Sequence, residues 1–175
     1  MEHEHTKKLV TASALAALTC VATLIVQIPS PMNGYVNLGD CIVLLSAWML
    51  GPFYGAAAAG IGSMLADIIS GYAFYAPGTL VIKALMALAA GAIYKAVSRR
   101  SDNFAAAHVP GALASELIMV FGYCAYSGLL LGSGWGALAS LPSNAAQGVL
   151  GMVGGLALAY ALRRTGFKGV NFLAA

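Results

Sequence analysis

Four ionisable side chains stand inside, or at the edge of, long apolar runs of this sequence: Asp40, Asp67, Lys83 and Glu116. A charged group in apolar surroundings has a large energetic cost unless it is paired or contacts water. Two roles fit carboxylates and an ammonium at such positions. They can form structural ion pairs that neutralise each other, or they can bind a small polar molecule.

The elements that carry these groups are predicted to cross a membrane. Of the 175 residues, 60% are hydrophobic and only 9% are charged, whereas soluble domains average about 25% charged residues. A helix needs about 20 residues to cross the ~30 Å apolar core of a bilayer. The second apolar run is short for this and is expected to begin in an outer loop or to tilt. The sequence predicts an all-α integral membrane bundle of six transmembrane helices, with soft boundaries at 9–28, 38–51, 53–70, 77–97, 108–131 and 143–163.

The basic residues indicate the orientation of this bundle. Eight of the nine Lys and Arg residues fall in three polar stretches, namely Lys7/Lys8, Lys95/Arg99/Arg100 and Arg163/Arg164/Lys168. Cytoplasmic loops carry an excess of Lys and Arg, so both termini and the loop 98–107 are predicted to be cytoplasmic. The outer loops 29–37, 71–76 and 132–142 contain no Lys or Arg. The net charge of +3 therefore reflects orientation in a cell membrane and not a nucleic-acid partner.

No linker in the chain is long enough to join two domains. We therefore expect residues 1–175 to form a single membrane domain, with a cytoplasmic tail over about residues 1–8. The turn at Gly51-Pro52 is predicted as an inner connection without charge.

This topology brings three of the four ionisable groups to one depth. Asp40 opens the second span at the outer side, and Asp67 closes the third span at the same side. Lys83 lies about 9 Å below the outer end of the fourth span, at 1.5 Å per residue. Asp67 and Lys83 can therefore form a structural pair, or Lys83 can contact a bound molecule. Glu116 is expected nearer the middle of the membrane, as a helix-bundle hydrogen-bonding group or as a substrate contact.

Aromatic and amide side chains converge on the same outer end. Taken singly, an aromatic residue there belongs to the belt found at membrane interfaces. Apolar walls with a few placed polar groups are typical of a small-molecule site. With the four ionisable residues, the predicted substrate-binding residues are Tyr35, Asn37, Tyr72, Tyr75, Tyr123, Trp135, Asn144 and Gln147.

Small residues recur at spacings that suit close helix contacts. Ala12 and Ala16 form an A-x-x-x-A pair in the first span. Small residues allow two helix backbones to approach closely in lipid, although such pairs are frequent by chance in a chain rich in alanine.

The sequence contains no arrangement of nucleophile and base, and no phosphate-binding loop. The three cysteines match no metal or redox spacing. We therefore predict no catalytic residue, no metal site, no cofactor bound by this chain and no ATP hydrolysis of its own.

Six segments of the chain carry a family resemblance, namely GYVNLGD at 34–40, LGPFYG at 50–55, GIGSMLAD at 60–67, SGY at 70–72, YAPGT at 75–79 and IKALM at 82–86. They resemble segments of the substrate-binding S components of energy-coupling-factor (ECF) vitamin transporters. The resemblance extends over roughly residues 10–165 and is strongest over 34–86.

This resemblance implies a transport subunit and not an enzyme. Such S components are multi-pass proteins of prokaryotic cell membranes, and they bind a water-soluble vitamin or precursor at the outer end. They dock on a membrane coupling protein with two ATPases, which use the ATP. Ala12 and Ala16 match the family's docking motif. The outer segments look most similar to a subgroup associated with pantothenate or vitamin B6-type cargo, and Lys83 would suit an anionic cargo such as pantothenate if it is not already neutralised.

A stand-alone secondary carrier of a small metabolite is the main alternative. Such carriers often contain inverted repeats and helices broken by Gly or Pro near the midplane. This sequence contains no convincing internal repeat, and its prolines lie at the ends of spans or in loops. The sequence favours the S component over the carrier.

Overall fold

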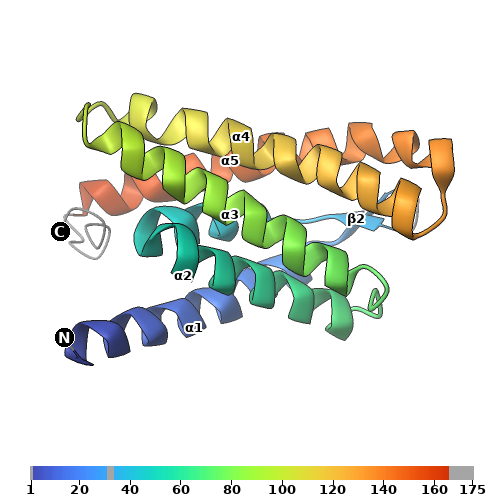
Figure 1. The fold of residues 1–175 in the computed structure, drawn as a ribbon, viewed down its shortest axis with the longest axis horizontal. Coiled ribbons are helices and arrows are strands. Elements are labelled where there is room, and N and C mark those ends of the chain that lie inside the picture. Colours follow the sequence, from blue (N-terminus) through green and yellow to red (C-terminus); the bar gives the residue numbers. More distant parts are fainter. Residues whose placement is uncertain (1, 31–33, 166–175) are drawn as a thin grey trace.

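The computed structural model describes residues 2–30 and 34–165, which form an elongated helical bundle (Figure 1). Five helices in this part of the chain are long and apolar enough to cross a membrane. The α-helices are α1 (Glu2–Ile25), α2 (Gly39–Ile69), α3 (Ala76–Ser98), α4 (Phe104–Ala125) and α5 (Leu141–Arg164). A π-helical turn, η2 (Tyr126–Leu130), extends α4, and a 3-10 helix, η3 (Gly134–Ser140), precedes α5.

The helix α2 reverses its direction at Gly51. This residue has φ 80° and ψ 179°, which interrupts the helix immediately before Pro52. A methyl group added at Gly55 would lie 2.8 Å from the Cα atom of Ala47, whereas residues eight apart in an unbroken helix are separated by about 12 Å. The two halves of α2 therefore pack against each other. The predicted turn at Gly51-Pro52 is confirmed, while the count of six membrane crossings stays a prediction.

Two boundaries differ from the sequence-based expectation. The helix α1 begins at Glu2, before the predicted start of the first span at residue 9, so residues 2–8 are helical. That they form a cytoplasmic tail stays a prediction. The outer segment 29–37, expected to be a loop, contains the strands β1 (Ile28–Ser30) and β2 (Gly34–Val36), paired antiparallel with Pro29 opposite Tyr35. Three-residue strands are too short to produce a readable alternation of polar and apolar residues.

The first half of α2 lies at the centre of the bundle. Its side chains Val43, Leu44, Ala47 and Trp48 are fully buried and belong to one cluster with Met86 of α3 and residues of α4 and α5. By contrast, α1 is the most exposed of the five long helices. The central position of α2 places its first residues, including Asp40, among four other elements.

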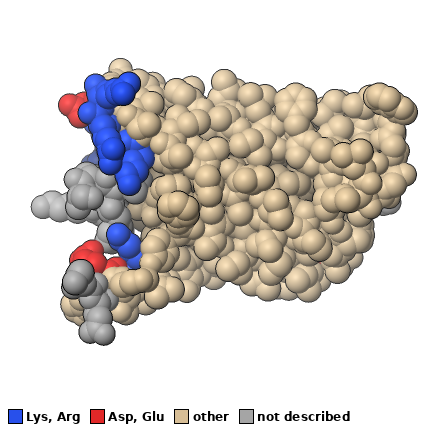
Figure 2. Space-filling model, viewed as in Figure 1, with Lys and Arg blue, Asp and Glu red and all other residues tan. Residues whose placement is uncertain are grey.

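Basic side chains gather at one end of the molecule, where α1 begins and α5 ends (Figure 2). They come from the three predicted groups, apart from Lys168, which lies outside the described residues. The hairpin of β1 and β2 lies at the opposite end (Figure 1). The positive-inside rule predicts that the basic end is cytoplasmic and that the hairpin end faces outward.

Candidate functional site

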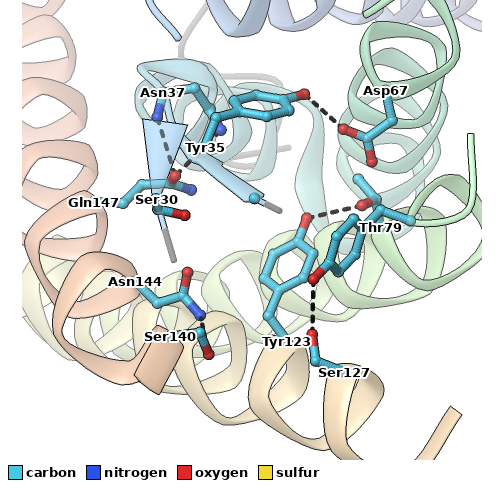
Figure 3. A pocket seen from close by; sticks show the side chains of 12 residues that line it. Ser30, Tyr35, Asn37, Asp67, Thr79, Tyr123, Ser127, Ser140, Asn144 and Gln147 are labelled. Atoms are coloured by element: carbon cyan, nitrogen blue, oxygen red, sulfur yellow. Dashed lines mark hydrogen bonds between the residues drawn. The ribbon is translucent and has the colours of Figure 1, made fainter. Parts of the chain in front are cut away.

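A pocket lies at the hairpin end, between β1, β2 and the adjoining ends of α2, α3, α4 and α5 (Figure 3). Its empty volume is about 480 Å³, which includes the part that is open to solvent. It is lined by Ser30, Gly34, Tyr35, Asn37, Asp67, Tyr75, Thr79, Tyr123, Ser127, Ser140, Asn144 and Gln147.

Asp67, near the end of α2, contributes a carboxylate to the pocket. The Tyr35 hydroxyl donates a 2.6 Å hydrogen bond to Asp67 Oδ1. Burial, and secondly the neighbouring carboxylate, raise the pKa of Tyr35 above its usual range, so Tyr35 remains a neutral donor. Asp67 Oδ2 is buried and has no partner in good hydrogen-bond geometry among the described residues, although the Thr79 hydroxyl lies near the carboxylate.

Tyrosine rings form a second side of the pocket. Tyr123 donates to Thr79 Oγ1 over 3.0 Å, and the hydroxyls of Tyr75 and Ser127 lie 2.9 Å apart. The ring centroids of Tyr75 and Tyr123 are separated by 6.2 Å. Ser127 is placed by the π-helical turn that extends α4, a feature often found at functional sites. These contacts orient the rings as fixed walls that suit a flat ligand.

Amide side chains of Asn37 and Gln147 form a third side. Gln147 Oε1 accepts hydrogen bonds from the Asn37 backbone N–H at 3.0 Å and from Asn37 Nδ2 at 3.2 Å. Gln147 Nε2 donates to Asp40 Oδ2 over 2.7 Å. Asn37 Oδ1 accepts from the backbone N–H of Gly39 at 2.8 Å. The chain of bonds ties the hairpin, the start of α2 and the start of α5 into one unit.

One of the two sequence-based alternatives was an ion pair between Lys83 and Asp67. The structure does not contain this pair. The Lys83 ammonium forms an ion pair with Asp40 Oδ1, and both side chains are buried. The ammonium also lies 5.5 Å from the centroid of the Tyr123 ring, within reach of a cation–π interaction. Neither Lys83 nor Asp40 lines the pocket. Their charges compensate each other behind its wall.

Glu116 is also behind the pocket and does not line it. It is buried, and neither carboxylate oxygen has a hydrogen-bond partner among the described residues. A methyl group at Gly151 would lie 2.6 Å from Asp40 Cβ and 3.1 Å from Glu116 Oε1. Gly151 therefore gives both acidic side chains the room that they occupy. The expected helix-bundle hydrogen bond of Glu116 is not present among the described residues.

Two predicted aromatic residues lie outside the pocket. Trp135 in η3 is 88% exposed, which agrees with an interfacial aromatic and not with a wall of the site. Tyr72 is half-buried, and its ring packs on Tyr35 with centroids 4.9 Å apart, so it supports a lining residue from behind.

The pocket also contains residues that sequence reasoning did not select: Ser30, Gly34, Thr79, Ser127 and Ser140. Four of the five are serine or threonine. These residues are also common in ordinary helix packing, so their presence in the sequence does not indicate a binding site. The position of Ser127 on the same helical face as Tyr123 was the one available signal.

The expected docking pair on α1 faces into the bundle. Ala12 is buried in a cluster with Ile42 and Leu45 of α2. A methyl group at Gly62 would lie 2.3 Å from the backbone oxygen of Ala16. Both alanines therefore contribute to the contact between α1 and α2, with Ala12 buried and Ala16 half-buried. The exposed small residues of α1 are Ser13, Ala14 and Ala17.

A membrane bundle with a small polar pocket at the end opposite its basic residues fits a substrate-binding transport subunit. The family model of the ECF-type riboflavin transporter S component matches residues 3–164. The chain therefore belongs to this family, and it is an integral plasma-membrane protein.

Two relatives and one solved structure extend this finding. An uncharacterised protein of Pyrococcus woesei is 37% identical over 145 residues, covering 82% of this chain and 93% of the relative. The thiamine precursor transporter HmpT of Lactococcus lactis is 29% identical over 170 residues, covering 95% and 93%. A solved structure described as the S component of a bacterial ECF transporter has a TM-score of 0.72 at 21% identity, covering 92% and 98%. The last similarity concerns the fold alone.

Proposed function

We propose that this chain binds a water-soluble vitamin precursor in the pocket at the hairpin end and delivers it for uptake. The observation that carries the proposal is the pocket itself, in which tyrosine walls and placed polar groups meet at the end opposite the basic residues. The similarity to a thiamine precursor transporter supports this type of cargo. The earlier suggestion of pantothenate or vitamin B6 has no support from the relatives, and we do not retain it.

We further propose that uptake is driven by a partner module of one membrane coupling protein and two ATPases. Membership of the S-component family supports this assignment. We propose that the module contacts the exposed face of α1 that carries Ser13, Ala14 and Ala17, because Ala12 and Ala16 are already occupied by α2. No observation favours the stand-alone carrier.

The direct test of the binding proposal is a ligand screen with the purified chain. We expect one vitamin or precursor, among thiamine and its two ring precursors, riboflavin, pyridoxine and pantothenate, to raise the melting temperature well above the others. A ligand at a hundred times its Kd stabilises the folded state by about 2.7 kcal/mol, or roughly 5–10 °C for a chain of this size. Absence of binding by every compound, measured by calorimetry as well, would contradict the proposed function.

A further inference from the structure

The described residues that line the pocket include an acidic side chain but no basic one. Asp67 is the one acidic residue among the described lining residues, and none of these residues is Lys, Arg or His. Residues 31–33, outside the described part of the hairpin, are Pro, Met and Asn and add no charge. The nearest cation of the outer half, Lys83, is held by Asp40. The pocket therefore presents a carboxylate without a cationic partner among its lining residues.

The groups around Asp67 leave a place for a donor from outside the protein. Asp67 is 6% exposed. Its carboxylate receives the Tyr35 hydrogen bond and lies near the Thr79 hydroxyl, and the charge of Lys83 also acts on it from outside the pocket lining. Oδ2 nevertheless has no partner in good geometry among the described residues. A ligand N–H that donates to Oδ2 would form its hydrogen bond in buried surroundings, where such a bond is stronger than in water.

The walls limit the shape of such a ligand. Tyr35, Tyr75 and Tyr123 line the pocket together with Asp67. Figure 3 shows Tyr35 reaching Asp67 and Tyr123 reaching Thr79. The three tyrosine rings favour a flat aromatic or cationic group. On the far side, Asn144 and Ser140 offer an amide and a hydroxyl 3.4 Å apart, which suit a short polar substituent.

Resting on the proposed function, we propose that the cargo is a small amino-substituted aromatic heterocycle and that Asp67 recognises its amino group. An exocyclic amino group can donate a hydrogen bond to Asp67 Oδ2, which has no partner in good geometry among the described residues. A ring nitrogen beside the amino group adds a second hydrogen bond to the carboxylate only when that nitrogen is protonated and can donate. An anionic cargo such as pantothenate would instead meet the Asp67 carboxylate with no free cation to offset the repulsion.

Paired substitutions and paired ligands test the proposal. The probes are the 4-aminopyrimidine alcohol from which thiamine is built, the same pyrimidine with hydrogen in place of the amino group, riboflavin and pantothenate. The protein is compared as wild type, as Asp67→Asn and as Asp102→Asn. Asp102→Asn is the matched control, because Asp102 is an exposed residue in the connection between α3 and α4 and does not line the pocket.

We expect the wild type to bind the aminopyrimidine best, with the deamino analogue at least tenfold weaker. A charge-assisted hydrogen bond corresponds to about ten- to a hundredfold in affinity. Asp67→Asn should lower affinity for the aminopyrimidine by that factor and change affinity for the deamino analogue by less than about threefold. Asp102→Asn should leave both unchanged. If Asp67→Asn fails to fold, the comparison of the two pyrimidines on the wild type still decides whether the amino group is recognised.

Three results would overturn the inference. Tight binding of pantothenate or riboflavin with little binding of the aminopyrimidine would remove the amino heterocycle but leave the proposed function standing. Equal affinity of the two pyrimidines, or of wild type and Asp67→Asn for the aminopyrimidine, would remove the role of Asp67. Absence of binding by all four probes would also remove the amino heterocycle, and the proposed function falls with it only when the wider vitamin screen finds no ligand either.

Discussion

The single change Lys83→Met is expected to destabilise the protein strongly, because it leaves Asp40 as a buried carboxylate without its ammonium partner. Lys83 and Asp40 are buried and form an ion pair. Removing one partner of such a pair costs on the order of 3–5 kcal/mol. In the variant, Asp40 would keep the Gln147 hydrogen bond but no opposite charge. We expect reduced expression and a much lower melting temperature in detergent.

A second substitution that restores the stability of Lys83→Met identifies the ion-pair partner of Lys83. Asp40→Asn combined with Lys83→Met removes both charges and should restore most of the stability, since an asparagine oxygen can still accept from Gln147. Asp67→Asn combined with Lys83→Met is the matched control and should not rescue. Rescue by the Asp67 change, with none by the Asp40 change, would show that Lys83 pairs with Asp67 after all.

The second large effect concerns the surface of α1. Ala17→Trp places a bulky ring on the exposed small face of α1, which is the proposed docking face. Two membrane helices approach closely where the residues between them are small, so the ring should block the proposed contact with the coupling protein. We expect uptake in cells that contain the full transporter to fall to near background. Ligand affinity of the purified variant should stay within about twofold, because no residue of α1 is among the described residues that line the pocket.

Two further tryptophan variants serve as controls for Ala17→Trp. Leu85→Trp adds a ring on the exposed surface of α3 and should leave uptake intact. Ala12→Trp should instead lower the stability of the isolated chain, because Ala12 packs against Ile42 and Leu45. Normal uptake by Ala17→Trp would place the docking surface elsewhere.

The sequence predicted the features that depend on strong local signals. Clustered Lys and Arg residues at one end, the break at Gly51-Pro52 and the meeting of aromatic and amide residues at the opposite end follow from charge, backbone restriction and topology. Seven of the predicted residues, Tyr35, Asn37, Asp67, Tyr75, Tyr123, Asn144 and Gln147, line the pocket.

The sequence could not show which of several residues at the same depth in the membrane contact each other. Asp40 and Asp67 are predicted at the same level as Lys83, and only the packing of α2 against α3 decides which of them is its partner. Similarly, α1 has small residues on two adjacent faces, so the sequence could not show that Ala12 faces α2 while Ala17 is exposed. The three-residue strands that carry Tyr35 had no periodicity to read.

Reconstitution of the purified chain in liposomes tests whether it is a binding subunit that depends on a partner module for transport. The vitamin precursor identified by the binding screen is supplied outside, and its accumulation is measured with and without the coupling protein, its two ATPases and enclosed ATP. We predict tight binding by the chain alone, no accumulation under any ion gradient, and uptake when the complete module and ATP are present. Accumulation by the chain alone, driven by an ion gradient, would contradict this prediction and favour a secondary carrier.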